Sequence, residues 1–253
     1  MIQLKNSAQI SAMMEAGRIT GEALLLAREH VREGVSTKEL DTLIREFIEK
    51  SGAKPSFLGY AGFPGSACIS INDEVIHGIP NKKRILKEGD IVKIDVGAFY
   101  GGFHGDSART IPVGKVSDEA LKLIKVTRDS FFAGVDMLKT GNRIGDVGHA
   151  IQSCVEKEGF SVVRRYIGHG VGRELHEQPD VPNFGTAGRG TRLCAGMTLA
   201  IEPMVNIGGA DVYELPDGWT VKTADKSLSA HYENTVALTS EGVIITTLVD
   251  KEW

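Results

Sequence analysis

The sequence predicts an α+β fold of two related halves, and three observations lead to this prediction. Helical periodicity alternates with β-branched runs along the 253 residues. A strand–turn–strand pattern over residues 91–110 carries two aspartates. The chain also matches itself at a shift of 107 residues, which places Gly34 on Gly141 and Asp95 on Glu202. Chance is the alternative explanation of the match. If the repeat is real, acidic residues on equivalent strands face a shared centre.

Length and composition set the broad class. The chain has 42% hydrophobic and 25% charged residues and a net charge of -4, which argues against nucleic-acid binding as its main activity. No run is apolar enough to span a membrane, and the N-terminus lacks a signal core. Three cysteines are too few for a disulfide framework. We expect a cytoplasmic protein with one catalytic domain, residues 1–253, whose halves are about 1–115 and 116–253.

Two helices are predicted at the start. The first spans residues 7 to about 31, with Ser7 as its N-cap and apolar residues at helical spacing. The second is capped by Ser36 or Thr37 and ends at Ser51–Gly52, a good helical C-terminus. Strand and loop follow as far as residue 80.

The stretch 91–110 is typical of a β-hairpin. Its first strand is rich in Ile and Val, and glycines after Tyr100 tolerate the positive φ angles of a tight turn. With Tyr100 and Gly101 at the tip, Asp95 faces Asp106 across the ladder. Facing carboxylates repel each other, so we predict a cation between them.

Strand-like runs recur in the second half at residues 162–166, 197–206 and 230–236. The glycine-rich segment 183–192 is predicted to be an exposed loop. We expect His231 to point to the opposite face of its strand from Glu233, and so away from the centre.

Five residues are candidate metal ligands: Asp95, Asp106, His169, Glu202 and Glu233. Four carboxylates and one imidazole form an oxygen-rich set, unlike structural zinc sites. This much negative charge suggests two ions, which together can activate water and polarise a carbonyl. Acids that interrupt apolar strands are costly to bury without such a partner.

Several segments, taken together and in order, carry a resemblance to a known family. They are Ile71–Pro80, Ile94–Gly97, His104–Thr110, Gly168–Glu177, Ile201–Met204 and Tyr232–Thr235. On these motifs the chain resembles the type I methionine aminopeptidases of peptidase family M24. The resemblance implies the creatinase-like pita-bread fold, with a central, curved antiparallel sheet covered by helices. It also implies removal of the initiator methionine from nascent proteins whose second residue is small.

The same resemblance implies roles for the candidate residues. Asp95 and Glu233 would serve both divalent ions, Asp106 one of them, and His169 with Glu202 the other. A metal-bound hydroxide would attack the scissile carbonyl. The metal could be Co, Mn, Fe or Zn, because all four accept carboxylate and imidazole ligands.

Further roles come from the same source. Glu202 would shuttle the proton, His77 would contact the scissile amide, and His176 would stabilise the oxyanion. The residues that match the methionine pocket are Tyr60, Phe63, Cys68 and Trp219. Departures from the family pattern are Phe57, Leu175, His231 and Asn234, where His231 and Asn234 replace a usual Gln and His.

The expected partners are N-terminal methionyl peptides and nascent chains, with transient ribosome association, no nucleic acid, no membrane and a monomeric state. Three alternatives stay open. A proline-directed peptidase usually has an additional N-terminal domain, but about 94 residues precede Asp95 here. A type II enzyme needs an insertion between His169 and Glu202, where 32 residues intervene. A non-catalytic relative is expected to lose ligands.

Overall fold

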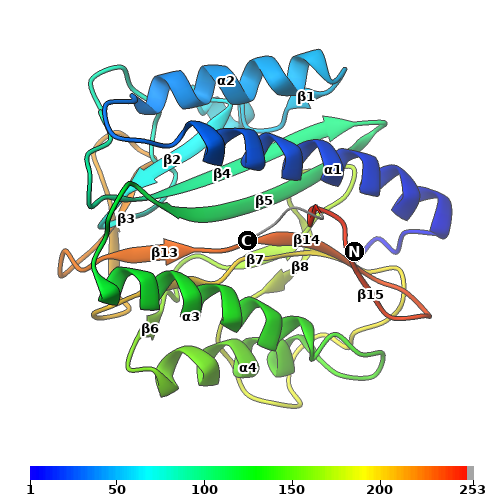
Figure 1. The fold of residues 1–253 in the computed structure, drawn as a ribbon. Coiled ribbons are helices and arrows are strands. Elements are labelled where there is room, and N and C mark those ends of the chain that lie inside the picture. The colour runs from blue at the N-terminus through cyan, green and yellow to red at the C-terminus, as the bar shows by residue number, and fades with distance from the viewer. Residues whose placement is uncertain (250–253) are drawn as a thin grey trace.

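The computed structural model describes residues 1–249, so the last four residues of the expected domain lie outside the described part (Figure 1). The elements of the first half are α1 (Ser7–His30), α2 (Thr37–Lys50), β1 (Lys54–Pro55), η1 (Tyr60–Gly62), β2 (Ala67–Ile71), β3 (Glu74–Ile76), β4 (Ile91–Tyr100) and β5 (Phe103–Pro112). The later elements are α3 (Asp118–Val135), α4 (Ile144–Lys157), β6 (Ser161–Val162), β7 (Gly168–Gly170), β8 (Glu177–Val181), β9 (Thr198–Ile201), β10 (Met204–Asn206), β11 (Val212–Glu214), β12 (Val221–Thr223), β13 (Ser229–His231), β14 (Asn234–Leu238) and β15 (Val243–Ile245).

Capping side chains start the first two helices. The Asn6 side chain accepts a hydrogen bond from the Gln9 amide at 2.9 Å, and the Gln9 side chain accepts one from the Asn6 amide. The predicted extent of α1 is therefore confirmed, but the prediction of Ser7 as its cap is wrong by one residue. The α2 helix has Ser36 as its N-cap, and Gly52 follows its end at φ 77°. Both features of α2 were predicted.

The hairpin β4–β5 is present, but its register differs from the predicted one. Tyr100 pairs with Phe103 around a two-glycine turn, so Asp106 lies opposite Gly97 and Asp95 lies opposite Ala108. The predicted pairing of the two aspartates is wrong by two residues. Because the side-chain period of a strand is two, this error leaves both aspartates on the same face as diagonal neighbours.

The internal repeat is confirmed in atomic detail. Helices α2 and α4 begin and end 107 residues apart, and Gly34 and Gly141 both have positive φ. The Gly34 amide donates to Leu86 at 2.9 Å, and the Gly141 amide donates to Leu193 at 3.2 Å. Each of these four residues has its counterpart at the same shift. The halves therefore share a local fold as well as a sequence pattern.

The acidic strands of the second half are interrupted where their glutamates lie. The predicted strand 197–206 is split at Glu202–Pro203 into β9 and β10, and the predicted strand 230–236 is split before Asn234 into β13 and β14. Pro203 has no N–H to donate to a ladder. The Glu233 amide instead donates to Ala108 of β5 at 2.9 Å. This contact joins the two halves.

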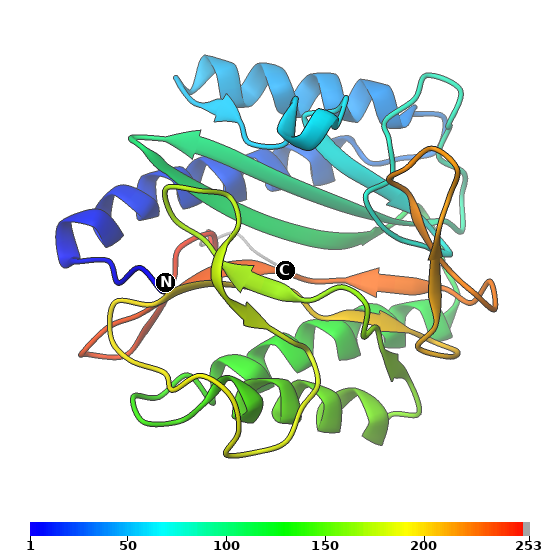
Figure 2. The ribbon, with the colours of Figure 1, turned by 180° about the vertical axis from the view of Figure 1, so that it is seen from behind.

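Helices cover one side of the strands. Helices α1 and α3 cross in front of the strands in Figure 1 and behind them in Figure 2, while loops occupy the other side. The α1 helix approaches β5 so closely that a Cβ at Gly105 would lie 2.8 Å from the Gly17 nitrogen. The main sheets are antiparallel, with β4 between β5 and β2, and β9 between β14 and β7. This arrangement confirms the predicted helix-covered antiparallel architecture.

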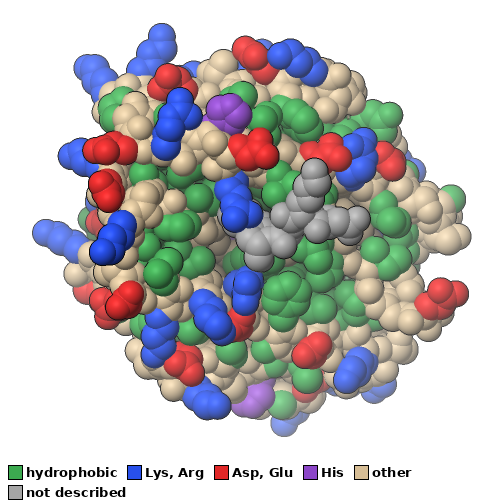
Figure 3. Space-filling model, viewed as in Figure 1, with side chains coloured by type: hydrophobic (Ala, Val, Ile, Leu, Met, Phe, Trp, Pro, Cys, Tyr) green, Lys and Arg blue, Asp and Glu red, His purple; other side chains and the backbone are tan. Residues whose placement is uncertain are grey.

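The helical face carries interspersed charges of both signs, with apolar groups between them (Figure 3). Within residues 1–249, no helix is both long enough and apolar enough to cross a membrane.

Candidate metal centre and substrate pocket

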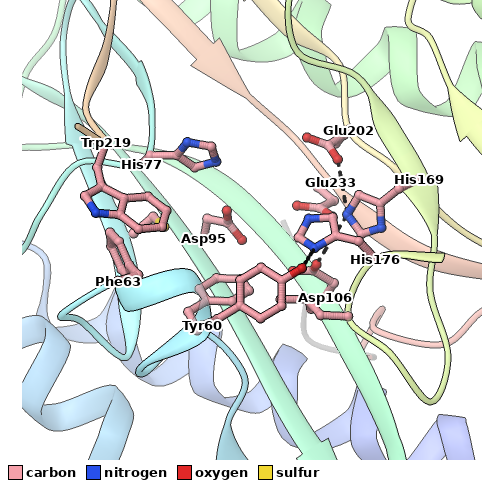
Figure 4. Close-up of a pocket in the computed structure, with 13 residues that line it drawn as sticks. Tyr60, Phe63, His77, Asp95, Asp106, His169, His176, Glu202, Trp219 and Glu233 are labelled. Atoms are coloured by element: carbon pink, nitrogen blue, oxygen red, sulfur yellow. Dashed lines mark hydrogen bonds and ion pairs between the residues drawn. The ribbon is translucent and has the colours of Figure 1, made fainter. Parts of the chain in front are cut away.

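The residues predicted to form the site meet at a cavity of about 170 Å³ (Figure 4). Its lining includes every predicted site residue: Tyr60, Phe63, Cys68, His77, Asp95, Asp106, His169, His176, Glu202, Trp219 and Glu233. These side chains come from β2, β4, β5, β7, the two strand interruptions and three loops. The fold thus brings together residues from both halves of the repeat.

The carboxylates at the base of the cavity lack ordinary partners. Asp106 and Glu233 are buried, while Asp95 and Glu202 keep slight exposure. Among the described residues, no hydrogen-bond partner contacts Asp95 Oδ1 or Asp106 Oδ1. Burial raises the pKa of Asp106 to about 7 and raises the pKa of Asp95, Glu202 and Glu233 well above their usual range. A group of buried carboxylates in this state calls for cations.

His169 presents a free nitrogen to these carboxylates. Its Nδ1 lies 2.8 Å from the Gly170 carbonyl, to which Nδ1–H donates. The opposite nitrogen, Nε2, lies 3.5 Å from Glu202 Oε1 and 3.7 Å from Asp106 Oδ2. Burial lowers the pKa of His169 to about 3, so the imidazole is neutral and has a lone pair available. A backbone carbonyl that fixes the tautomer in this way is common behind metal-bound histidine.

The described part of the chain holds two groups with metal-ligand spacing, and Glu233 belongs to both. One group is Asp106, His169 and Glu233, and the other is Asp95, His231 and Glu233, each with ligand atoms within 4.8 Å of one another. Carboxylate and imidazole donors suit divalent metals, and the unpartnered buried oxygens fit such a cation. Asp95 lies in one group, so its expected sharing between two ions stays a prediction.

His231 lies inside the site, and the prediction that it points away is wrong. Its Nε2 is 3.7 Å from Glu233 Oε2 and 3.9 Å from Glu202 Oε2. Residues 231 and 233 are two apart, so strand alternation places them on the same face. The correct period was therefore sufficient to find this residue.

His77 occupies a strained position at the edge of the pocket. Its φ is 59°, which is uncommon for a residue with a side chain. A Cβ at the next residue, Gly78, would lie 2.2 Å from the Ile69 carbonyl oxygen, so only glycine lets the chain pass there. The His77 ring meets Trp219 edge to face at 6.2 Å and Tyr166 at 5.8 Å. Burial lowers the pKa of His77 to about 4, and the ring is neutral. Nothing in the sequence pattern pointed to Tyr166.

His176 is oriented by a tyrosine from the other half of the chain. Tyr60 Oη lies 2.7 Å from His176 Nδ1, as the dashed line in Figure 4 marks. Burial raises the pKa of Tyr60 and lowers that of His176, which favours a neutral phenol beside a neutral imidazole. If the phenol donates to Nδ1, the proton of His176 resides on Nε2. The ring also packs on His169, with centroids 4.1 Å apart.

An apolar wall closes the other end of the cavity. Phe63 and Trp219 meet edge to face at 5.0 Å, and Cys68 is buried beside them. Phe57 and Leu175, where the sequence departs from the family pattern, are buried and line the same cavity. The volume is below the ~300–1,000 Å³ of typical small-molecule sites. The pocket therefore suits one side chain.

Comparisons with known proteins agree with this geometry. The model of metallopeptidase family M24 matches residues 11–240. A methionine aminopeptidase of Clostridium perfringens is 56% identical, over 98% of this chain and 100% of its own length. The crystal structure of methionine aminopeptidase from Thermotoga maritima superposes with a TM-score of 0.97 at 46% identity, covering 98% of this chain and 100% of that chain.

A prolidase from Pyrococcus furiosus shares the fold, with a TM-score of 0.80 at 24% identity. This chain is matched over 98% of its length but covers 66% of the prolidase. The family model and the relatives at high identity each span nearly all of this sequence. The chain belongs to metallopeptidase family M24.

Proposed function

We propose that this protein is a methionine aminopeptidase that removes the initiator methionine from chains whose second residue is small. The observation that carries the proposal is the junction of a carboxylate–imidazole cluster with a small apolar pocket. The cluster supplies hydrolytic chemistry, and the pocket selects the side chain. The names of the relatives support the same activity.

The proposed metal ligands are Asp95, Asp106, His169, Glu202 and Glu233. Two groups that share Glu233 support a pair of divalent ions, drawn from Co, Mn, Fe and Zn. Such ions, when bound, would lower the pKa of water and polarise the scissile carbonyl. The acidic cluster also attracts the free α-amino group of a substrate, which suits an exopeptidase.

Three side chains are proposed to act on the substrate. Burial raises the pKa of Glu202, so its carboxyl can take a proton from the attacking water and return it to the leaving amine. His176 Nε2–H would donate to the carbonyl oxygen as negative charge develops there. His77, from the opposite wall, would contact the scissile amide (Figure 4).

The proposed methionine pocket consists of Tyr60, Phe63, Cys68 and Trp219. A flexible thioether fills irregular apolar space well and makes favourable contacts with aromatic edges. Phe57 and Leu175 narrow the same cavity, which supports selection of an unbranched side chain. A bulky second residue would have to pass His77 and His176 at the mouth.

For the whole chain we propose one catalytic domain, with halves of about 1–115 and 116–253. The contribution of both halves to one cavity supports this division. Initiator methionine removal accompanies translation, so we also propose a cytoplasmic monomer that acts on nascent chains and associates transiently with ribosomes.

A peptide-release assay tests the proposed activity. The purified protein, loaded with Co²⁺ or Mn²⁺, is expected to release methionine from Met-Gly and Met-Ala peptides and to leave X-Pro peptides uncut. Chelation should abolish the release, and added metal should restore it. Cleavage of X-Pro peptides alone would favour the prolidase type of activity instead. Activity that survives chelation would contradict the proposal.

A further inference from the structure

His231 is the buried group that the proposed mechanism leaves without a task. Its side chain is about 1% exposed, and within residues 1–249 neither Nδ1 nor Nε2 has a hydrogen-bond partner. A buried imidazole without partners is costly, because its polar atoms lose water and gain nothing. Such a group in a native fold calls for a ligand that the protein alone does not provide.

The internal repeat places His231 at the counterpart of a proposed metal ligand. On the β4–β5 ladder, Gly97 pairs with Asp106. On the β10–β13 ladder, Met204 pairs with His231. Gly97 and Met204 are themselves related by the shift of 107 residues. His231 therefore occupies in the second half the position that Asp106 occupies in the first.

The distances around His231 resemble those around His169. His169 Nε2 lies 3.5 and 3.7 Å from two carboxylate oxygens, and His231 Nε2 lies 3.7 and 3.9 Å from two others. These gaps are too long for hydrogen bonds. They fit donors that surround one ion at roughly 2.0–2.2 Å each. Glu202 and Glu233 each have one oxygen near His231.

The charge state of His231 also suits a ligand. Burial lowers its pKa to about 3, and the cations Lys93 and Arg109 act in the same direction. The ring is therefore neutral near pH 7, and neutral imidazole is the form that binds metal. Asp95 Oδ1, the unpartnered oxygen of the same group, offers a further donor.

We propose that His231 is a ligand of the ion held by Asp95 and Glu233, so that each of the two metal positions has one imidazole. This inference rests on the proposed metallopeptidase function. It assigns a mixed nitrogen and oxygen set to a position that otherwise has carboxylates alone. Imidazole favours Fe²⁺, Co²⁺ and Zn²⁺ more strongly than Mn²⁺, which prefers oxygen. The Asp95 position should therefore discriminate between these metals.

The test is metal binding by the full-length, metal-free protein, observed without reference to turnover. Co²⁺ is added to two equivalents under anaerobic conditions. Binding is followed by calorimetry and by proton NMR of the exchangeable imidazole N–H signals that the paramagnetic ion shifts. Wild type is expected to show two such signals. His231→Gln is expected to show one and to bind the second Co²⁺ at least about tenfold more weakly.

Mn²⁺ and a matched variant separate ligation from a general structural effect. The weakening in His231→Gln should be larger for Co²⁺ than for Mn²⁺, because the lost donor is nitrogen. His149→Gln makes the same chemical change at an exposed position of α4 and should leave both signals and both affinities unchanged. Equal weakening for both metals would overturn the proposal.

The wild-type spectrum decides the question even if His231→Gln does not fold. Two bound Co²⁺ ions with one shifted imidazole signal would overturn the role of His231 and leave the metallopeptidase proposal intact. Failure to bind Co²⁺ at all would overturn both. Two signals, assigned to His169 and His231 by histidine labelling, would establish the second imidazole.

Discussion

Tyr60 Oη lies 2.7 Å from His176 Nδ1 and links the loop after α2 to the loop before β8. This contact fixes which nitrogen of His176 faces the cavity. We expect Tyr60→Phe to lower kcat on methionyl peptides about tenfold, equivalent to ~1.4 kcal/mol, with metal content unchanged. Tyr100→Phe, at the hairpin tip, makes the same change away from the cavity and should match wild type. Equal kcat for Tyr60→Phe and wild type would contradict the orienting role.

His77 and His176 line the cavity but belong to neither group with ligand spacing in the described chain. We expect His77→Ala and His176→Ala to bind metal normally and to lose about 10²–10³-fold in kcat/KM, as expected for a missing transition-state donor. Metal analysis and peptide kinetics on the same samples check this. Loss of metal together with activity would instead make them structural residues.

Asp41 supports the loop that carries the pocket residues. Its Oδ1 accepts hydrogen bonds from the Ser66 and Ala67 amides at 2.6 and 3.1 Å, and the side chain is buried. Asp41→Ala leaves both amides without this acceptor and should lower the free energy of unfolding by about 2–4 kcal/mol. Urea denaturation measures the loss. Asp41→Asn keeps an acceptor oxygen and should lose clearly less; equal losses would contradict the hydrogen-bond explanation.

The pH dependence of stability should reverse when metal binds. Burial raises the pKa of Asp106 from 3.8 to about 7, so between these values the metal-free native state holds a proton that the unfolded chain has released. The free energy of unfolding of the metal-free protein should therefore fall as pH rises through this window. Divalent metal, which binds the ionised form, should make it rise instead.

Thermal denaturation of metal-free protein between about pH 4 and pH 7 measures this slope. Asp106→Asn removes one of the titrating groups and should give a shallower fall. An unchanged slope in this variant would show that Asp106 ionises normally in the native state.

The sequence was sufficient for the helices, the repeat and the set of residues at the cavity. Local signals determine these features: caps, glycines at helix ends, and acids within apolar strands. The hairpin register was not determined, because a glycine pair allows the turn at either of two positions. The aspartates kept a common face because the error was an even number of residues.

Two other features depend on tertiary contacts. The strand interruption before Asn234 occurs because the Glu233 backbone pairs with Ala108 in the other half, which no local pattern reveals. The aromatic contact between Tyr166 and His77 likewise joins distant segments. The position of His231 is different, since the alternation of its own strand already placed it beside Glu233.

The account depends most directly on metal-dependent cleavage after an N-terminal methionine. The decisive measurement is release of methionine from a Met-Gly peptide while metal-free protein is titrated with Co²⁺. We expect no release without metal, and activity that rises with binding and reaches its plateau by two equivalents. Full activity of protein shown by elemental analysis to lack metal would contradict the account.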